Sequence, residues 1–301
     1  MSISQYIKEI GRGKDGARSL SRVQATDLLG QVLDGSVTDL EVGAFCLAMR
    51  IKGETPEEMA GFLDATHPRL HLVPAGDTPA VVIPSYNGAR KLPVLTPLLA
   101  LLLAREGLSV LVHGTATESS RVDASKVLAA LGIQAQTAIK PIASGEVMLA
   151  PTALLCPGLQ RLLEVRRVVG LRNPGHSLVK LMSPVEGKSL IVSSYTHPEY
   201  AISMAAVFEL MQANALLLRG TEGEAVADPR RMPQMDGFVA GRRQRLQEAQ
   251  TGTLAALPDL PKDIDAATTA AYIRQVLAGS SPVPAPIARQ VEHILHLVSQ
   301  I

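Results

Sequence analysis

The chain has 301 residues, 47% of them hydrophobic, and its 29 basic and 28 acidic residues leave a formal net charge of +1. The apolar content is enough for a folded core, and the balanced charge excludes a global attraction to nucleic acid or to a membrane surface. A site for a polyanion must therefore be local. Cys46 and Cys156 have no Cys or His partner at metal-ligand spacing, which argues against a disulfide framework and zinc and favours a reducing cytoplasm.

The N-terminal quarter has the periodicity of short helices. Between residues 20 and 65, apolar side chains recur at intervals of three and four. Ser21 is placed to cap one helix, and Thr55-Pro56-Glu57-Glu58 is a typical helix start, because Pro fits the first turn and acids favour the positive end of the helix dipole. We expect a small helical domain over residues 1–74, with a returning segment near residues 160–184.

After Pro74 the pattern changes to short apolar runs that alternate with helical stretches. This alternation predicts an α/β fold, in which residues 75–301 form a mostly parallel sheet covered by helices. The longest apolar stretch, residues 93–104, is well short of the ~20 residues that span a bilayer, so we expect no membrane segment. The predicted strands are residues 80–83, 109–112, 147–149, 190–192 and 215–218, and the predicted helices are residues 93–105, 123–131, 199–212, 266–278 and 284–298.

One loop follows the first predicted strand. Ser85-Tyr86-Asn87-Gly88-Ala89-Arg90-Lys91 stands where a nucleotide-binding α/β protein normally has a glycine-rich phosphate loop, and it has one glycine, no carboxylate and two adjacent cations. The carboxyl ends of parallel strands are the usual ligand-binding edge of such a sheet. Asn87, Arg90 and Lys91 are therefore candidate ligand-binding residues.

A cationic segment lies near the N-terminus, at residues 11–18. Its three glycines expose backbone amides, and with three cations they form a chain segment suited to grip phosphate oxygens. The alternative is a solvated loop between two helices. The candidate residues are Arg12, Lys14 and Arg18.

A second cationic segment, residues 161–180, contains six potentially cationic side chains. Arg and Lys neutralise phosphates without reading bases. The alternative is an ordinary helix surface on which arginines pair with Glu164 and its neighbours, where such pairs contribute about 0–1 kcal/mol. The later run Arg242, Arg243 and Arg245 is a candidate extension of this cationic surface, but we favour the alternative, the solvated face of a polar helix. The candidate polyanion-binding residues of the second segment are Arg166, Arg172, His176 and Lys180.

His113 follows an apolar run and precedes a glycine. An ordinary histidine titrates near neutral pH, so His113 is a candidate acid or base on a bound nucleotide and is included among the polyanion-binding candidates. The alternative is a hydrogen-bonded histidine at a strand end. Tyr86, Tyr195 and Tyr200 are candidates either for stacking on bases or for ordinary packing.

Several separated blocks of the chain resemble anthranilate phosphoribosyltransferases and nucleoside phosphorylases. These blocks are residues 36–60, His113-Gly114-Thr115, residues 123–132 and residues 219–224. The resemblance covers nearly the whole chain and implies the fold of those enzymes, with Arg166 at their substrate-arginine position.

The catalytic blocks of that family are changed in this chain. The family's Gly-Thr-Gly-Gly-Asp loop lets backbone amides approach a pyrophosphate, and here Ser85-Tyr86-Asn87-Gly88-Ala89 takes its place. The family's two magnesium-binding acids are replaced by Ala225 and Val226, although Glu222 and Glu224 lie close by. Because the metal neutralises a leaving pyrophosphate, this loss argues against magnesium-assisted phosphoribosyl transfer.

The replacement blocks are similar to the YbiB-type branch of the same fold. They are residues 84–91, residues 172–181, His197-Pro198-Glu199-Tyr200 and residues 220–224. This resemblance implies a homodimer that binds single- or double-stranded DNA or RNA with little sequence preference and shows no anthranilate phosphoribosyltransferase activity. The apolar faces of the N-terminal helices favour an isologous dimer through the small domain.

The leading hypothesis is therefore a cytoplasmic, non-catalytic, nucleic-acid-binding protein with no catalytic residue, no metal and no cofactor. The alternative is a glycosyl or phosphoribosyl transferase, a pentosyltransferase that uses magnesium and phosphoribosyl pyrophosphate with an altered acceptor. It is supported by the retained fold and by His113, Ser119 and Arg166.

Overall fold

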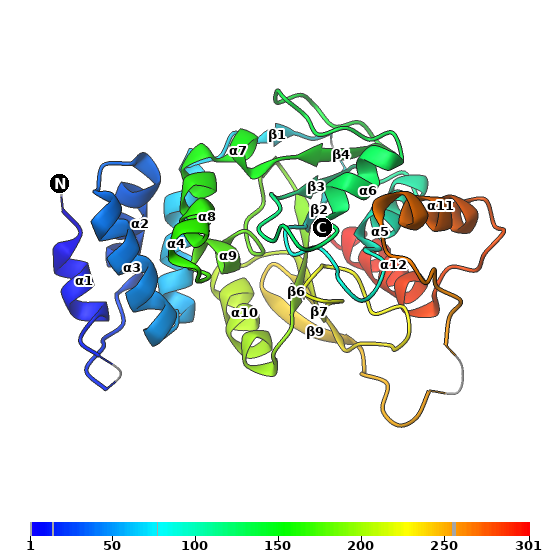
Figure 1. Ribbon diagram of the computed structural model, residues 1–301. Helices are drawn as coiled ribbons and strands as arrows, with labels where there is room; N and C mark the ends of the chain where they lie inside the picture. The colour runs from blue at the N-terminus through cyan, green and yellow to red at the C-terminus, as the bar shows by residue number, and fades with distance from the viewer. Residues whose placement is uncertain (1, 14, 77, 255–256) are drawn as a thin grey trace. The chain divides into compact units, whose positions relative to one another are not determined.

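The computed structural model describes residues 2–13, 15–76, 78–254 and 257–301 (Figure 1). The chain divides into two compact units. The first unit comprises Met1–His71 and Thr152–Pro184, and the second comprises Leu72–Pro151 and Val185–Ile301. The predicted fold class is confirmed, with a helical unit at the N-terminus and a larger α/β unit whose sheet is mostly parallel.

Local capping explains where the helices of the first unit begin. Three helices begin with a capping box, at Ser21, Thr38 and Thr55. The side chain of each cap residue accepts a hydrogen bond from the backbone N–H three residues on, and the Gln or Glu side chain at that position accepts the backbone N–H of the cap residue. These reciprocal bonds satisfy amides that a helix end otherwise leaves open. The helices of this unit are α1 (Ser4–Ile10), α2 (Arg22–Asp34), α3 (Asp39–Lys52), α4 (Pro56–Thr66), the 3-10 turn His67–Arg69, α7 (Thr152–Leu155), α8 (Pro157–Val169) and α9 (Gly175–Leu178).

The core of the first unit joins the N-terminal helices to the returning segment. The rings of Phe45 and Phe62 meet edge to face with centroids 6.0 Å apart, and both are fully buried. The Arg161 guanidinium donates to the carbonyl of Leu33 at 2.7 Å, at the end of α2. Arg161 therefore closes a helix end, in addition to carrying positive charge.

The second unit contains a seven-stranded sheet in the order β4-β3-β2-β6-β7-β8-β9. The first five strands of that order run parallel, and β8 and β9 run antiparallel. A separate short parallel ladder joins β1 (Val73–Pro74) to β5 (Val185–Glu186). The strands of the main sheet are β2 (Ala80–Pro84), β3 (Val110–His113), β4 (Val147–Ala150), β6 (Ser189–Tyr195), β7 (Ala215–Arg219), β8 (Met235–Val239) and β9 (Arg242–Gln247).

Helices cover both faces of this sheet. Alternate strand residues such as Val81, Val112 and Leu216 form one buried cluster with apolar residues of α5 (Thr96–Arg105), α6 (Ala124–Ala130), α11 (Ala266–Leu277) and α12 (Ala285–Val298). Figure 1 shows these four helices gathered on one side of the sheet. On the other face lies α10 (Pro198–Leu210), where the rings of Phe208 and Phe238 are 5.3 Å apart.

One expectation about secondary structure is wrong. The run of arginines beginning at Arg242 lies on strand β9, not on a polar helix. The strand is made of Arg and Gln residues with one apolar residue, Leu246, so it lacks the period-two hydrophobic signal of a half-buried strand. Within the described ranges, no helix combines the length and the apolar character needed to cross a membrane.

Candidate functional site

The parallel register brings several loops to one edge of the sheet in the second unit. Pro84 at the end of β2 lies beside His113 at the end of β3, and Tyr195 of β6 lies beside Arg219 of β7. The loop after β2 and the loop after β7 therefore begin at the same edge. We refer to it as the carboxyl edge, which is the usual ligand-binding edge of a parallel sheet.

Glu224, which belongs to the loop after β7, is enclosed by the loop that follows β2. Its side chain is buried, and one carboxylate oxygen accepts the backbone N–H of Asn87 at 3.0 Å and that of Gly88 at 2.8 Å. The other oxygen accepts the hydroxyls of Ser85 at 2.5 Å and of Thr96 at 2.9 Å. Four donors on one buried anion are the kind of surroundings that a bound phosphate group requires.

Glu222 closes the far end of the same loop. Its two carboxylate oxygens accept the backbone N–H groups of Arg90 at 2.7 Å and Lys91 at 3.0 Å. We refer to Glu222 and Glu224, together with the loop groups that they bind, as the carboxylate latch. The hydrogen-bond donors of this loop are therefore occupied by two carboxylates of the protein's own chain.

The turn that presents the two acids has an unusual backbone. Glu222 has a φ of 54° and Gly223 a φ of 91°, both in the left-handed region that disfavours most side chains. The carbonyl of Gly223 accepts hydrogen bonds from the Asn87 side-chain amide at 2.9 Å and the Ser194 hydroxyl at 3.0 Å. Arg121 reaches the carbonyl of Glu222 at 3.4 Å. The surrounding donors thus stabilise a backbone conformation that is unfavourable by itself.

The residues present do not fit a magnesium-bound sugar pyrophosphate. The carboxylate of Glu224 accepts hydrogen bonds from the donors that would otherwise bind the pyrophosphate. Ala225 and Val226 are buried, and their side chains have no atom that binds a metal. Within the described part of the chain, no three or more His, Cys, Asp or Glu side chains are grouped so that they could hold a metal ion. Glu222 and Glu224, which lie close to the replaced metal-binding positions, act instead as hydrogen-bond acceptors for the loop.

Two candidate ligand-binding residues of the second unit are interior residues. The Asn87 side chain is buried and binds Gly223, so its amide is not a surface contact. His113 is fully buried, and neither ring nitrogen has a hydrogen-bond partner among the described residues. Burial lowers the pKa of His113 to about 3, so the ring is neutral near pH 7. For this reason His113 adds no positive charge to the carboxyl edge.

The two cations of the loop, by contrast, are exposed to solvent. Arg90 and Lys91 are exposed, and among the residues described neither side chain takes part in an ion pair. Their backbone amides are fixed by Glu222, which sets where the two side chains leave the loop. The sequence interpretation missed Arg219, an exposed arginine at the end of β7, because it stands at the end of an apolar strand with no cationic neighbour.

The remaining candidates belong to the first unit. Arg12 is ion-paired with Glu9 at 2.6 Å, Arg18 is exposed, and Lys14 lies outside the described residues. His176 is buried, with its Nδ1 atom 3.3 Å from the Asn173 carbonyl, so it is not a surface contact either. The candidates that are partly exposed are Arg166, Arg172 and Lys180.

Comparison with known proteins identifies the class. Residues 4–67 match the helical bundle domain of the glycosyl transferase family. Anthranilate phosphoribosyltransferase from Thermus thermophilus superposes with a TM-score of 0.73 at 22% identity, covering 96% of this chain and 85% of that chain. The Saccharomyces cerevisiae enzyme, solved with PRPP and Mg, gives 0.68 at 16% identity, with 99% and 88% covered. The fold is thus that of the anthranilate phosphoribosyltransferase-like proteins.

Sequence relatives narrow this class to a family. Anthranilate phosphoribosyltransferase of Methanosarcina acetivorans is 28% identical over 298 residues, which cover 91% of this chain and 74% of the relative. YbiB of Escherichia coli strain K12 is 41% identical over 301 residues, which cover 97% of this chain and 92% of YbiB. The chain belongs to the family of YbiB.

Proposed function

We propose that this protein binds nucleic acid without sequence preference at the carboxyl edge of its second unit, and that it does not transfer phosphoribosyl groups. One observation carries the proposal. The loop that would hold a sugar pyrophosphate is closed on Glu224, while Arg90 and Lys91 of the same loop stay exposed.

The closed loop argues against a phosphoribosyl substrate. To admit a pyrophosphate, the loop has to release Glu224, which then loses four donors and faces a second anion. Depriving a buried charge of its partners costs about 3–5 kcal/mol, before any repulsion between the two anions is counted. No group of metal ligands among the described residues offsets that repulsion.

The exposed cations favour a polymeric anion. Arg90 and Lys91 are exposed in the loop that follows β2, and Arg219 is exposed at the end of β7; both strands end at the carboxyl edge. A nucleic acid presents a regular series of phosphates, and each phosphate that a cation neutralises releases a counterion, which favours binding without any base contact. A near-neutral chain achieves this when its cations are collected at one edge.

We propose that the first unit supplies a homodimer contact. Leu40, Leu47 and Ile51 of α3 are 84%, 46% and 63% exposed, and their spacing of seven and four residues places them on one side of the helix. Val168 of α8 is 89% exposed in the same unit. Large apolar side chains at such exposure favour burial against a second copy of the chain through an isologous interface.

A salt titration tests the proposed function. Fluorescence anisotropy of a labelled single strand of about 20 nucleotides, a duplex of the same length and an RNA strand is measured with the wild-type protein at several salt concentrations. The proposal predicts saturable binding to all three, with the logarithm of the binding constant falling linearly with the logarithm of salt. If none of the three nucleic acids binds saturably at low salt, the proposed function is refuted.

A further inference from the structure

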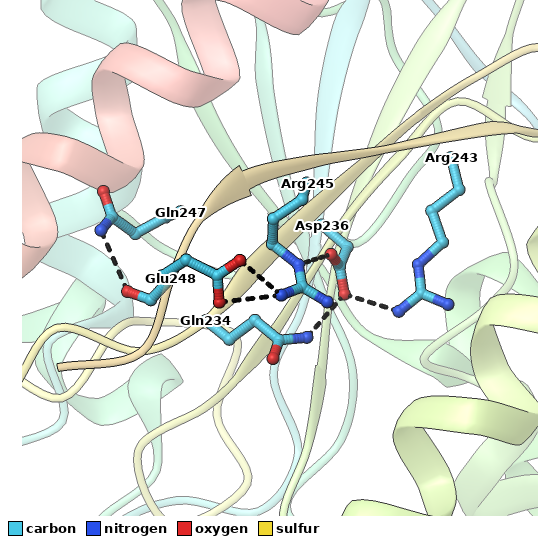
Figure 2. Close-up of polar contacts among 6 residues, drawn as sticks. All are labelled: Gln234, Asp236, Arg243, Arg245, Gln247 and Glu248. Atoms are coloured by element: carbon cyan, nitrogen blue, oxygen red, sulfur yellow. Dashed lines mark hydrogen bonds and ion pairs between the residues drawn. The ribbon is translucent and has the colours of Figure 1, made fainter. Parts of the chain in front are cut away.

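A buried carboxylate on the outer part of the sheet holds two arginines. Asp236 of β8 is 1% exposed, and its two oxygens accept Arg245 Nε at 2.5 Å and Arg243 Nη2 at 2.9 Å (Figure 2). Gln234 adds a bond to Asp236 at 2.9 Å, and Glu248 accepts from Arg245 Nη1 at 2.9 Å. Figure 2 shows the Asp236 carboxylate lying between the two guanidinium groups.

The two arginines lie on one face of the edge strand. Arg243 and Arg245 are separated by two positions on β9, so their side chains project from the same face. This face also carries Phe238, which packs on α10. The pKa of Tyr195 lies above its usual value, mainly because the side chain is buried and also because of the charge of Asp236. The charges of Arg219, Arg245 and Arg243 act in the opposite direction. Arg219 of the carboxyl edge and the two β9 arginines therefore act on the same tyrosine.

The hydrogen bonds leave part of each guanidinium available. A guanidinium has five N–H donors in a planar fork that fits two phosphate oxygens. Among the described residues, Arg243 uses Nη2 and Arg245 uses Nε and Nη1, and their side chains remain 38% and 40% exposed. Because Asp236 already fixes both side chains, less side-chain entropy is lost when a phosphate binds.

A purely structural ion pair accounts for only part of this arrangement. One arginine is enough to neutralise one buried carboxylate, whereas here two arginines bind Asp236, and one of them also pairs with the exposed Glu248. Burial would raise the pKa of Asp236, but hydrogen bonds from Arg245, Arg243 and Gln234 outweigh it and hold the pKa below its usual range. The carboxylate is thus a permanent anion that orients the two guanidinium groups.

We propose that Arg243 and Arg245, oriented by Asp236, form a second contact for phosphodiester groups of a bound nucleic acid. This inference rests on the proposed function and extends its site from the carboxyl edge to the edge strand β9. Asp236 is the positioning residue, and the two arginines make the contact. The ligand chemistry is a phosphate oxygen, which a polymer backbone or a free phosphate ion supplies.

The test compares variants in the salt titration. The double variant Arg243→Ala and Arg245→Ala is expected to bind a labelled single strand roughly tenfold more weakly, with a salt slope smaller by about 1.4. The double variant with lysine at both positions keeps the charge but not the fork on Asp236, so it is expected to keep the slope and bind several-fold more weakly. Arg289→Ala is the matched control, because Arg289 is also half exposed and is paired with Glu292 at 2.6 Å.

The possible outcomes separate this inference from the proposed function. If the wild type fails to bind any strand, the proposed function fails and the inference with it. If the wild type binds and the alanine double variant matches Arg289→Ala in affinity and slope, only the inference is overturned. Equal affinity of the lysine variant and the wild type would remove the positioning role of Asp236.

A competition measurement with inorganic phosphate and a replacement variant complete the test. Inorganic phosphate is expected to compete with the strand no better than chloride at equal ionic strength, and specific competition would assign the arginines to a small-ion site and overturn the inference. Should the alanine double variant fail to fold in a thermal scan, Arg243→Gln replaces it, because the pair between Arg245 and Asp236 is retained. A decrease of about 0.7 in slope for Arg243→Gln supports the inference, and an unchanged slope contradicts it.

Discussion

The carboxylate of Glu224 accepts the backbone N–H of Gly88 at 2.8 Å, although 136 positions separate the two residues along the chain. This bond belongs to the carboxylate latch, which fills the anion-binding loop with one of the protein's own acids. Within this transferase-like fold, the Glu224 carboxylate therefore takes the place of a phosphate ligand as the acceptor for the loop. Its consequences for stability and ligand binding are measurable.

Removing the latch acid destabilises the protein. In Glu224→Ala the loop donors lose their acceptor, and two of these donors are backbone amides buried in the loop. We expect the free energy of unfolding to fall by about 2–4 kcal/mol, measured by urea denaturation. Glu248→Ala, at an acid that is 75% exposed, is the control and changes stability by less than about 0.5 kcal/mol. Equal effects of the two substitutions would show that the latch does not hold the loop.

The same variant gains an affinity for small anions. Without the Glu224 carboxylate, the amides of Asn87 and Gly88 and the hydroxyls of Ser85 and Thr96 are donors without an acceptor. Inorganic pyrophosphate at millimolar concentration is expected to raise the melting temperature of Glu224→Ala by several degrees and to leave that of the wild type unchanged, at equal ionic strength. A similar rise for the wild type would mean that the loop is open to anions in the native protein.

Acid destabilises the fold through His113. Burial lowers the pKa of His113 to about 3, whereas an unfolded histidine has its ordinary pKa of about 6.5. Between these values the unfolded chain binds a proton that the folded chain does not. The stabilising contribution is therefore complete above about pH 6.5 and is lost as pH falls toward 3, by about 1.4 kcal/mol per pH unit.

A neutral replacement at this position tests the acid effect. In His113→Gln that proton is absent from both states, so the stability of the variant is expected to fall less steeply with acid by this amount, as measured by urea denaturation at about pH 7, 5.5 and 4.5. Parallel curves for the wild type and the variant would show that another group controls acid unfolding.

Charge on the exposed face of α3 is expected to prevent the proposed dimer from forming. Leu47→Glu combined with Ile51→Glu places two carboxylates where the proposed interface buries apolar surface. The molar mass from light scattering is expected to fall to half the wild-type value. Leu257→Glu is the control, since Leu257 is 66% exposed in the second unit and is expected to keep the wild-type mass. A monomeric wild type, or a double variant of unchanged mass, would contradict the proposed interface.

Much of the fold was predictable because its signals are local. The caps at Ser21 and Thr55 act within three residues, and the apolar strands that form the centre of the sheet are continuous short runs. Strand β9 was not predictable in this way, since its Arg and Gln side chains are typical of an exposed surface. Pairing with β8 and the carboxylate of Asp236 determine its conformation, and both are tertiary contacts.

The candidate site was predictable only in part. The position of the loop at a strand end and the two cations Arg90 and Lys91 follow from the sequence. The role of Glu224 does not, because an acid beside a family metal motif suggests a metal ligand and its acceptor role depends on donors far away in the chain. The burial of His113 likewise depends on its place in the sheet, between Pro84 and Ala150.

The salt dependence of nucleic-acid binding by Arg90→Ala combined with Lys91→Ala tests the central claim most directly. The comparison is a pair of cations outside this edge, Arg105→Ala with Lys188→Ala, which lie at the end of α5 and just before β6. We predict that the loop variant binds a single strand roughly tenfold or more weakly, with a salt slope smaller by about 1.4, and that the comparison variant matches the wild type. Equal slopes for the two variants would contradict the assignment of the nucleic-acid site to the loop that Glu224 closes.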